Sequence, residues 1–341
     1  MVAEASVKPI RLALIGAGIY ARDAHAPALL RLRDRFQVAA VCARSLASAD
    51  ALAARFGSDV DRCTDIPALL ARDDIEAVAI LLPIDVQAAV VAQALATGKH
   101  VISEKPIAPD VAAAVALIVA YAPQPGQVWM VAENWRYEEA YERAAELVRN
   151  GAIGQVRSVH FAYYVAMRPG NKYYASTWRR AGDFQGGFLL DGGVHFVAAM
   201  RMVAGEITAV AAHAAQFAPD LPPADMLTAS LQFANGALGT YLTCFAAATP
   251  WGAPLTVVGD LGSLRVERGR VEVVDAQGKM ETINCGVYNG VERELVAFAA
   301  AIREGQPHRN TPAEALRDVA VVEAMLVAAH TERAVLVVVR A

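Results

Sequence analysis

The chain has 341 residues, 55% of them hydrophobic, and a formal net charge of −4 at pH 7. This length exceeds one typical core, so two domains are expected, and the apolar content argues against a disordered chain. The slightly acidic balance provides no basic face for a nucleic acid. A small-molecule ligand is therefore the better expectation.

No membrane or export signal is apparent. The longest wholly apolar run, Val111–Ala122, has 12 residues. It is well short of the roughly 20 residues needed to cross a bilayer, and it predicts a buried helix. Glu4 and Lys8 precede the first strand without an apolar signal region, so a cytoplasmic location is expected. The cysteines form no C-x-x-C pair, which favours reduced thiols and indicates neither a disulfide framework nor a metal site. They are Cys42, Cys63, Cys244 and Cys285.

A glycine-rich turn follows the first predicted strand, 11–15. The stretch Gly16-Ala17-Gly18-Ile19-Tyr20-Ala21 has the form G-x-G-x-x-A and leads into a helical run to about Leu32. Gly16 permits the tight turn, Gly18 lets a pyrophosphate approach the backbone, and Ala21 allows close packing of helix on strand. The helix N-terminus offers N–H groups to the phosphates. The stretch predicts a dinucleotide-binding turn, with a purely structural turn as the alternative.

The second predicted strand, Phe36–Cys42, is followed by Ala43 and then by Arg44-Ser45. An NAD-specific site would place Asp or Glu near this point, against the ribose hydroxyls. Arg44 instead suits adenine stacking or a 2′-phosphate, and Ser45 is able to donate to that phosphate. The expected cofactor is NADP, with NAD as the alternative. A solvated arginine at a helix start is the structural alternative for Arg44.

Strands and helices alternate up to residue 132, which predicts an α/β, doubly wound parallel sheet of the Rossmann type. The predicted elements are helices 47–56, 66–71, 86–97 and 111–122 and strands 77–82, 101–104 and 128–132. Leu82-Pro83 follows at a strand end and is expected against the cofactor, or as a plain strand-to-helix turn. We expect the NAD(P)-binding domain to comprise residues 1–133 and a substrate-binding and oligomerisation domain to comprise residues 134–341.

A carboxylate, an amine and a proline, Glu104-Lys105-Pro106, end the strand that contains Val101 and Ile102. Pro106 cannot continue a ladder because it has no N–H. Ligands of such sheets collect at the carboxyl ends of the strands, so Lys105 is expected to face a cleft. An ordinary solvated lysine is the alternative.

The pattern changes after residue 137. A helix is expected over 137–150, and strands separated by turns then imply an α+β domain with a large, mostly antiparallel, open sheet. The predicted strands are 156–166, 208–216, 227–233, 237–245, 255–258, 263–266 and 271–274. Thr311-Pro312-Ala313-Glu314 has the form of a capping box and begins a helix to about His330. One face of this sheet must be covered, by helices or by a second subunit.

Asp191 and His195 belong to a glycine-rich segment that leads into a helical run ending near Gly205. At a spacing of four residues the carboxylate and the imidazole share one helix face and are able to interact. The glycines on both sides leave room for a ligand. A structural pair is the alternative.

These motifs occur in the order seen in one family. The glycine-rich turn, Glu104-Lys105-Pro106, Glu133-Asn134-Trp135-Arg136-Tyr137, Trp178-Arg179 and the Asp191/His195 segment resemble the glucose-fructose oxidoreductase, inositol dehydrogenase and MocA family. The resemblance covers nearly the whole chain. It implies NAD(P)-dependent oxidation or reduction of a hydroxyl or carbonyl group on a sugar, a cyclitol or a related small molecule. It also implies a homodimer or homotetramer formed through the C-terminal sheet.

The resemblance assigns roles to individual residues. Lys105, Asp191 and His195 match the catalytic group, and the bond between Lys105 and Pro106 is commonly cis in relatives, which fixes where the lysine points. His195 is expected to shuttle the proton, Lys105 to donate a hydrogen bond or to act as the acid, and Asp191 to orient the pair. Other residues are expected to line the site, with core packing as their alternative and with Arg179 also near the cofactor. They are Trp135, Arg136, Tyr163, Tyr164, Trp178 and Arg179.

Two positions depart from the family pattern. Many relatives carry Asp where this chain has Ala198 and His where it has Gln87, which indicates a subgroup with its own substrate. A function of a different class is a non-catalytic protein of the same fold that senses NADP or a sugar. The joint presence of Lys105, Asp191 and His195 favours the enzyme. A metal-dependent hydrolase lacks further ligands at metal-binding spacing.

Overall fold

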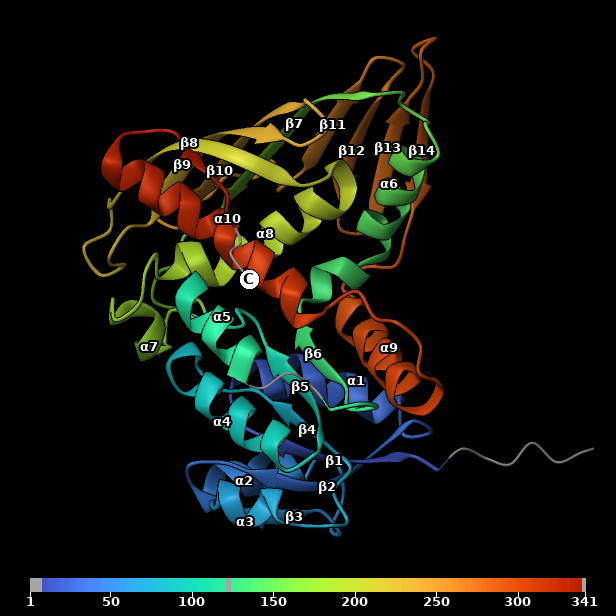
Figure 1. The fold of residues 1–341 in the computed structure, drawn as a ribbon, viewed down its shortest axis with the longest axis vertical. Coiled ribbons are helices and arrows are strands. Elements are labelled where there is room, and N and C mark those ends of the chain that lie inside the picture. The colour runs from blue at the N-terminus through green and yellow to red at the C-terminus, as the bar shows by residue number, and fades with distance from the viewer. Residues whose placement is uncertain (1–7, 121–123, 339–341) are drawn as a thin grey trace, which may run out of the picture. The chain divides into compact units, whose positions relative to one another are not determined.

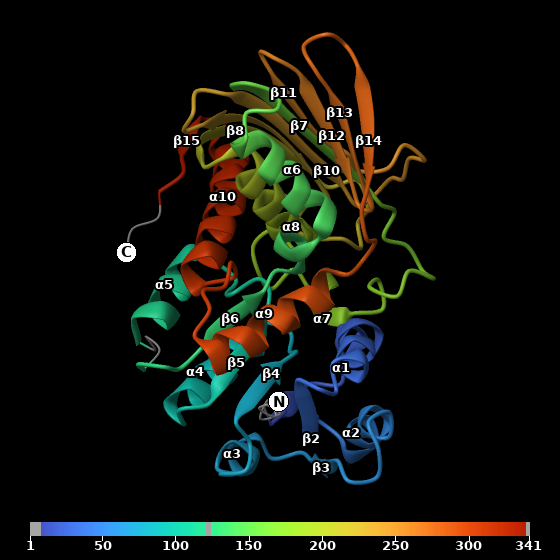
Figure 2. The same ribbon diagram turned by 90° about the vertical axis from the view of Figure 1, so that its right-hand side faces the viewer.

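The computed structural model describes residues 8–120 and 124–338, which form two compact units (Figures 1 and 2). Of the described residues, the first unit comprises 8–107, 116–120, 124–132 and 291–312. The second comprises 108–115, 133–290 and 313–338. The last residues of the helix predicted over 111–122 lie outside the described residues.

The first unit is built on a six-stranded parallel sheet in the order β3-β2-β1-β4-β5-β6. Its strands are β1 (Ile10–Ile15), β2 (Phe36–Cys42), β3 (Asp61–Cys63), β4 (Ala77–Ile80), β5 (His100–Glu104) and β6 (Trp129–Ala132). Its helical segments are η1 (Ala21–His25), α1 (Ala26–Arg31), α2 (Leu46–Ala53), α3 (Ile66–Leu70), α4 (Ile84–Ala96), the second half of α5 (Val111–Ala120) and α9 (Gly290–Glu304). The predicted doubly wound parallel sheet is confirmed, and β1 and β4 meet at the point where the strand order reverses.

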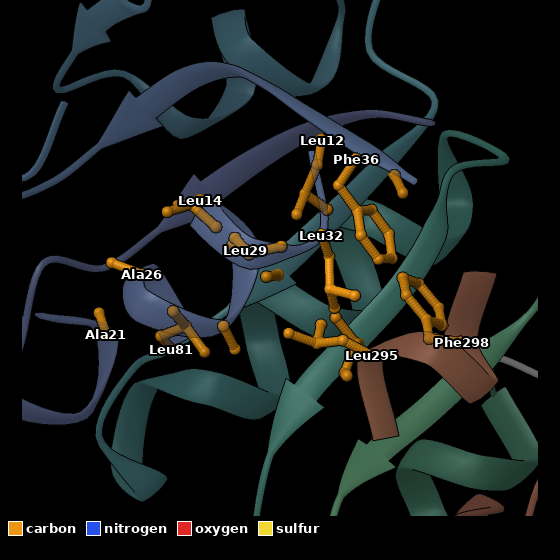
Figure 3. Packing of buried hydrophobic residues seen from close by; sticks show 14 of the residues in the cluster. Leu12, Leu14, Ala21, Ala26, Leu29, Leu32, Phe36, Leu81, Leu295 and Phe298 are labelled. Atoms are coloured by element: carbon orange, nitrogen blue, oxygen red, sulfur yellow. The ribbon is translucent and has the colours of Figure 1, made fainter. Parts of the chain in front are cut away.

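The hydrophobic core of this unit explains why its strands read as unbroken apolar runs. Leu12 and Leu14 of β1 are fully buried, because helices cover both faces of a parallel sheet. Leu295 and Phe298 of α9 lie in the same core, and the Phe298 ring stacks on Phe36 with centroids 6.4 Å apart (Figure 3). The segment 291–312, which was expected in the second domain, thus packs with the first unit.

The second unit contains a nine-stranded sheet in the order β14-β13-β12-β11-β7-β10-β9-β8-β15. Its strands are β7 (Val156–Tyr164), β8 (Ile207–Ala215), β9 (Met226–Phe233), β10 (Leu238–Cys244), β11 (Leu255–Gly259), β12 (Ser263–Glu267), β13 (Arg270–Val274), β14 (Met280–Asn284) and β15 (Val335–Leu336). All neighbours pair antiparallel except β7 and β10. The prediction of a large, mostly antiparallel sheet is confirmed.

Helices of the second unit lie together on one face of this sheet (Figures 1 and 2). They are α6 (Glu139–Arg149), α8 (Phe188–Ala204) and α10 (Pro312–Thr331). Two shorter helical segments, η2 (Asn134–Tyr137) and α7 (Thr177–Arg180), precede α6 and α8 respectively. Along β7 the side chains alternate between buried and more exposed positions, as a sheet covered on one face requires.

Six elements of the described chain were not predicted, among them the short helical segments η2 and α7. The strands β3 and β15 have only 3 and 2 residues, too few for a period-two pattern, and β14 is polar and mostly exposed. The helix α9 does carry an apolar pattern, at Val291, Leu295 and Phe298, which follows the helical spacing i, i+4, i+7. No helix among residues 8–120 and 124–338 is long and apolar enough to cross a membrane.

Candidate functional site

The glycine-rich turn connects β1 to the helical segment that continues as η1. Gly16 has a φ of +110°, and a Cβ atom there would lie 2.3 Å from the carbonyl oxygen of Leu81, so only glycine fits. A Cβ at Gly18 would meet no atom within 4 Å, so the backbone there is open to an approaching group. Ala21 is buried where the helix packs on the sheet. A pyrophosphate fits this arrangement, because one side of the turn is closed by protein and the other is open.

Arg44 and Ser45 follow β2 at the same edge of the sheet as Gly16, whose N–H donates to the carbonyl oxygen of Cys42 at 2.8 Å. Both side chains are exposed. Ser45 is also the N-cap of α2, and its Oγ accepts from the N–H of Ser48 at 3.3 Å. Arg44 is thus available at the surface position where a 2′-phosphate is expected, and Ser45 already has a structural task.

The ends of β1, β4 and β5 bring three predicted elements to one edge. Ile15 is in register with Ile80, and Ile80 with Ser103, so the glycine turn, Leu82-Pro83 and Glu104-Lys105 follow neighbouring strands. Pro83 is the N-cap of α4. The bond between Lys105 and Pro106 is cis, as the resemblance implied. Lys105 itself is half-buried.

Two buried side chains hold the Glu104-Lys105-Pro106 segment. Gln87 of α4 donates its Nε2 to the carbonyl oxygens of Glu104 at 2.6 Å and of Pro106 at 3.1 Å. His25, at the end of η1, places its Nε2 2.9 Å from the Glu104 carboxylate. Tyr20 packs edge-on against the His25 ring with centroids 5.5 Å apart. The glycine turn and the lysine motif are thereby joined through a histidine to which the sequence assigned no role.

The catalytic histidine predicted in the second unit is paired with a carboxylate. His195 of α8 places its Nδ1 2.6 Å from Oε1 of Glu133, whose side chain is 2% exposed. The same Oε1 accepts from the N–H of Trp135 at 3.1 Å. The Trp135 ring stacks on the imidazole with centroids 5.7 Å apart and planes 18° apart. This pair is the chemically most informative arrangement in the unit.

Asp191 of α8 is bound by an arginine of the short helix α7. Its Oδ2 accepts from Nε of Arg179 at 2.7 Å, and Nη1 of Arg179 donates to Ser176 Oγ at 2.9 Å. The Arg179 guanidinium also lies over the Trp178 ring, 4.1 Å from its centroid. Asp191, Arg179 and Trp178 therefore form one group, and the carboxylate paired with His195 Nδ1 comes from Glu133.

Arg136, predicted as a substrate residue, belongs to a buried ion-pair network. It is 4% exposed, and its Nη2 donates to both carboxylate oxygens of Asp318 at 2.8 and 2.7 Å. Arg201 also donates to Oδ1 of Asp318, at 2.5 Å, and binds Glu206 and Glu314. The guanidinium of Arg136 thus contributes to the interior of the second unit, and we do not include it in the proposed substrate site.

The two predicted tyrosines lie at the end of β7. The Tyr163 ring packs on Phe196 of α8 with centroids 4.6 Å apart, and burial raises the pKa of its hydroxyl. The contact of Tyr163 with Phe196 therefore fits the alternative that this tyrosine packs in the core. Tyr164 is half-buried.

The glycines around Asp191 serve packing. A Cβ at Gly193 would lie 3.1 Å from the Tyr241 hydroxyl and 3.3 Å from Val322. At the start of α8, Gly187 has a φ of +49° and its Cβ would lie 2.6 Å from the Pro222 carbonyl oxygen. The expectation that these glycines leave room for a ligand is wrong at both positions, because protein atoms occupy the space.

Both parts of the chain match known family descriptions. Residues 10–133 match "Oxidoreductase family, NAD-binding Rossmann fold" and residues 145–337 match "Oxidoreductase family, C-terminal alpha/beta domain" of the Gfo/Idh/MocA group. The dehydrogenase FPY6 of Fusarium mangiferae is 36% identical over 335 residues, which cover 93% of this chain and 95% of that protein.

Two further proteins extend the comparison. A dTDP-3,4-didehydro-2,6-dideoxy-α-D-glucose 3-reductase of Actinomadura kijaniata is 31% identical over 201 residues, 59% of this chain and 58% of the reductase. The crystal structure of an oxidoreductase from Thermotoga maritima superimposes with a TM-score of 0.90 at 31% identity, covering 97% of this chain and 99% of that one. The chain therefore belongs to the Gfo/Idh/MocA oxidoreductase family, and its N-terminal part is that family's NAD-binding Rossmann domain.

Proposed function

We propose that this oxidoreductase transfers a hydride between a nicotinamide and the carbon that bears a hydroxyl or carbonyl group in a sugar, a cyclitol or a related small molecule, with NADP as the preferred cofactor. The observation that carries the proposal is the contact of His195 Nδ1 with the buried Glu133 carboxylate at 2.6 Å. A histidine held in this way suits proton transfer at neutral pH. Membership in the oxidoreductase family supports a redox reaction that uses a nicotinamide cofactor.

The bound nicotinamide would supply or accept the hydride. The glycine turn and the N–H groups that follow it hold the pyrophosphate, and Gly18 gives it room. Lys105 donates a hydrogen bond to the reacting oxygen, and His195 gives that oxygen a proton or takes one from it. Asp191, fixed by Arg179, accepts hydrogen bonds from neighbouring hydroxyl groups of the substrate.

The preference for NADP rests on Arg44. Its exposed guanidinium follows β2, where an acidic residue would be expected for NAD. We expect Arg44→Ser to weaken NADPH binding by at least tenfold and to leave NADH binding nearly unchanged, since only NADPH carries the 2′-phosphate. Equal affinities of the wild-type protein for the two nucleotides would contradict the preference, and tighter binding of NADH would favour NAD as the cofactor.

A polyhydroxylated or carbonyl substrate is favoured by the group around Asp191. The Trp178 face and the Arg179 fork combine an apolar surface for sugar C–H groups with donors for oxygen atoms. Trp135 and Tyr164 are proposed as further walls. The reductase of Actinomadura kijaniata, to judge by its name, acts on a deoxygenated keto sugar carried on a nucleotide, and dTDP-linked keto sugars therefore belong in the substrate screen beside aldoses and inositols.

The deciding experiment measures binding and turnover separately. Tryptophan fluorescence would follow titration with NADPH and NADH, and absorbance at the nicotinamide band would follow turnover across the screen. Turnover that collapses in Lys105→Met and His195→Ala, with nucleotide binding retained in His195→Ala, supports the enzyme. Tight NADPH binding without turnover on any substrate would favour the sensor of NADP or a sugar instead.

We further propose a cytoplasmic homodimer or homotetramer formed through the face of the nine-stranded sheet opposite α6, α8 and α10. Leu238 of β10 is 61% exposed, an unusual position for an apolar side chain in the centre of a sheet. Sedimentation of the wild-type protein and of Leu238→Lys tests this contact. A monomer in both samples would contradict it.

A further inference from the structure

We propose that Glu133 is the positioning residue of His195: it accepts the Nδ1 proton and thereby makes Nε2 the atom that exchanges a proton with the substrate. This inference rests on the proposed function and refines it. The sequence pattern gave the orienting role to Asp191 and no role to Glu133. The contact between Glu133 and His195 Nδ1 supports an orienting role for Glu133.

The chemistry of a buried carboxylate fixes the direction of this hydrogen bond. An ionised carboxylate only accepts hydrogen bonds, so a ring nitrogen 2.6 Å from it must carry the proton. Oε1 of Glu133 also accepts from the Trp135 N–H at 3.1 Å, which fixes the carboxylate itself. The neutral imidazole is therefore the Nδ1–H tautomer, and its Nε2 lone pair is the acceptor.

Aromatic contacts fix the plane of the imidazole. Trp135 stacks on one face of His195, and the Trp135 ring is in turn stacked on Tyr141, with centroids 5.2 Å apart. The Arg268 guanidinium lies 4.4 Å from the centroid of Trp135. With its plane held by stacking and its Nδ1 held by Glu133, the ring has little rotational freedom left.

The charges around the pair come from several elements. Glu133 precedes η2, Asp191 lies one turn before His195 on α8, and Arg268 lies between β12 and β13. Asp191 is engaged by Arg179 at 2.7 Å, so its negative charge is partly compensated. Glu133 lies within hydrogen-bonding distance of Nδ1 and is therefore well placed to stabilise the imidazolium.

The proton balance follows directly. In the oxidation direction the C–H and O–H bonds of the substrate alcohol break and a C=O bond forms. The hydride would pass from this carbon to the oxidised nicotinamide, which is thereby reduced, and the proton moves to Nε2 of His195. The resulting imidazolium donates Nδ1–H to Glu133, which stays ionised throughout. Reduction reverses each step.

The first test does not depend on turnover. Selective 15N labelling of the histidines distinguishes a protonated from an unprotonated ring nitrogen by NMR, and His195→Gln identifies the signals of His195. We expect the Nδ1–H tautomer in the wild-type protein near neutral pH. We expect both tautomers in Glu133→Leu, because the acceptor is gone, while the signals of His25, which faces Glu104, stay unchanged. An Nε2–H tautomer for wild-type His195 would overturn the inference even if Glu133→Leu did not fold.

The second test uses Glu133→Gln, which keeps the shape and removes the charge. We expect the NMR titration midpoint of His195 and the acidic limb of the kcat/KM profile to move to lower pH together, and kcat/KM at neutral pH to fall about 10- to 100-fold. Glu294→Gln, which neutralises another fully buried carboxylate, is the matched control and should move neither. An unmoved midpoint in Glu133→Gln contradicts the inference, whereas a moved midpoint in a protein without any turnover contradicts only the proposed function.

Discussion

The side-chain amide of Gln87 lies 2.6 Å from the carbonyl oxygen of Glu104. It also reaches the carbonyl oxygen of Pro106 at 3.1 Å, so a single side chain holds the backbone on both sides of Lys105. Gln87 is 1% exposed. The sequence marked this position as a departure from a common histidine and associated it with substrate choice, whereas the structure gives it a role in placing the lysine.

We predict that Gln87→Leu lowers kcat/KM by about 100-fold, because a displacement of a reacting group by about 1 Å has an effect of that size. Nucleotide binding should change much less. Gln127→Leu is the matched control, since Gln127 also bridges two carbonyl oxygens of the same unit, those of Leu95 and Lys99. Both variants should lose about 1–3 kcal/mol of stability from unpaired buried carbonyls. Equal kinetic losses in the two variants would show that the effect of Gln87 is only structural.

We predict that Arg179→Lys lowers kcat/KM at least tenfold, because lysine cannot bind Asp191 and Ser176 at once while lying flat on Trp178. The neighbouring Arg180 offers a control. It stacks on Tyr174 and donates to the Tyr174 carbonyl oxygen, which ties it to its own loop. Arg180→Lys should retain kcat/KM within about twofold. Steady-state kinetics of the two variants on one substrate measures both values of kcat/KM and so tests this prediction.

The features that could be predicted from the sequence are those that depend on residues close together in the chain. The turn at Gly16 and the buried strands around it depend on residues within a few positions of one another, so pattern and conformation agree there. The contact between Glu133 and His195 joins residues 62 positions apart, and that between Gln87 and Glu104 joins residues 17 apart. Such pairs form only when helices pack, so no local spacing indicates them. Asp191 and His195 share a helix, and their spacing did not indicate that Arg179 would bind the aspartate.

The segment 291–312 shows a different limit. Its apolar spacing at Val291, Leu295 and Phe298 indicates a helix, but the spacing does not say which core receives the helix. Because the segment follows residue 133 in the chain, we expected it in the second domain. The structure places Phe298 on Phe36 in the first unit, because the parallel sheet there has a face to be covered. Periodicity therefore predicts an element more readily than its partner.

We predict that the first unit loses stability as the pH falls below about 6.5. Burial lowers the pKa of His100 and of His308 from 6.5. The Nδ1 of His100 accepts the N–H of Val128 at 3.1 Å, which a protonated nitrogen cannot do. Because the folded pKa is the lower one, the unfolded chain binds more protons below pH 6.5, and the contribution present in full above that pH is lost as the pH falls.

Thermal unfolding at about pH 7.5 and about pH 5.5 measures this dependence. His100→Asn keeps an acceptor for Val128 and removes the titrating group, so its melting temperature should change less between the two pH values. His330→Asn, at the exposed end of α10, is the control and should behave like the wild-type protein. The prediction fails if His100→Asn shows the full pH dependence.

Asp318 provides the last prediction, which separates buried from exposed ion pairs in one network. Its carboxylate is 2% exposed and binds both Arg136 and Arg201, and burial raises its pKa in spite of the two arginines. Because burial of these charges is costly, the ion pairs of Asp318 with the two arginines add little net stability. Removing the carboxylate, however, leaves two buried guanidinium groups without the anion that they share. We expect Asp318→Asn to lower the free energy of unfolding by about 3–5 kcal/mol.

Glu206 also binds Arg201, but its side chain is 49% exposed, so Glu206→Gln should lower the free energy of unfolding by no more than about 1 kcal/mol. Urea unfolding of both variants would contradict this view if the two losses were equal, because burial of the carboxylate would then not determine the cost.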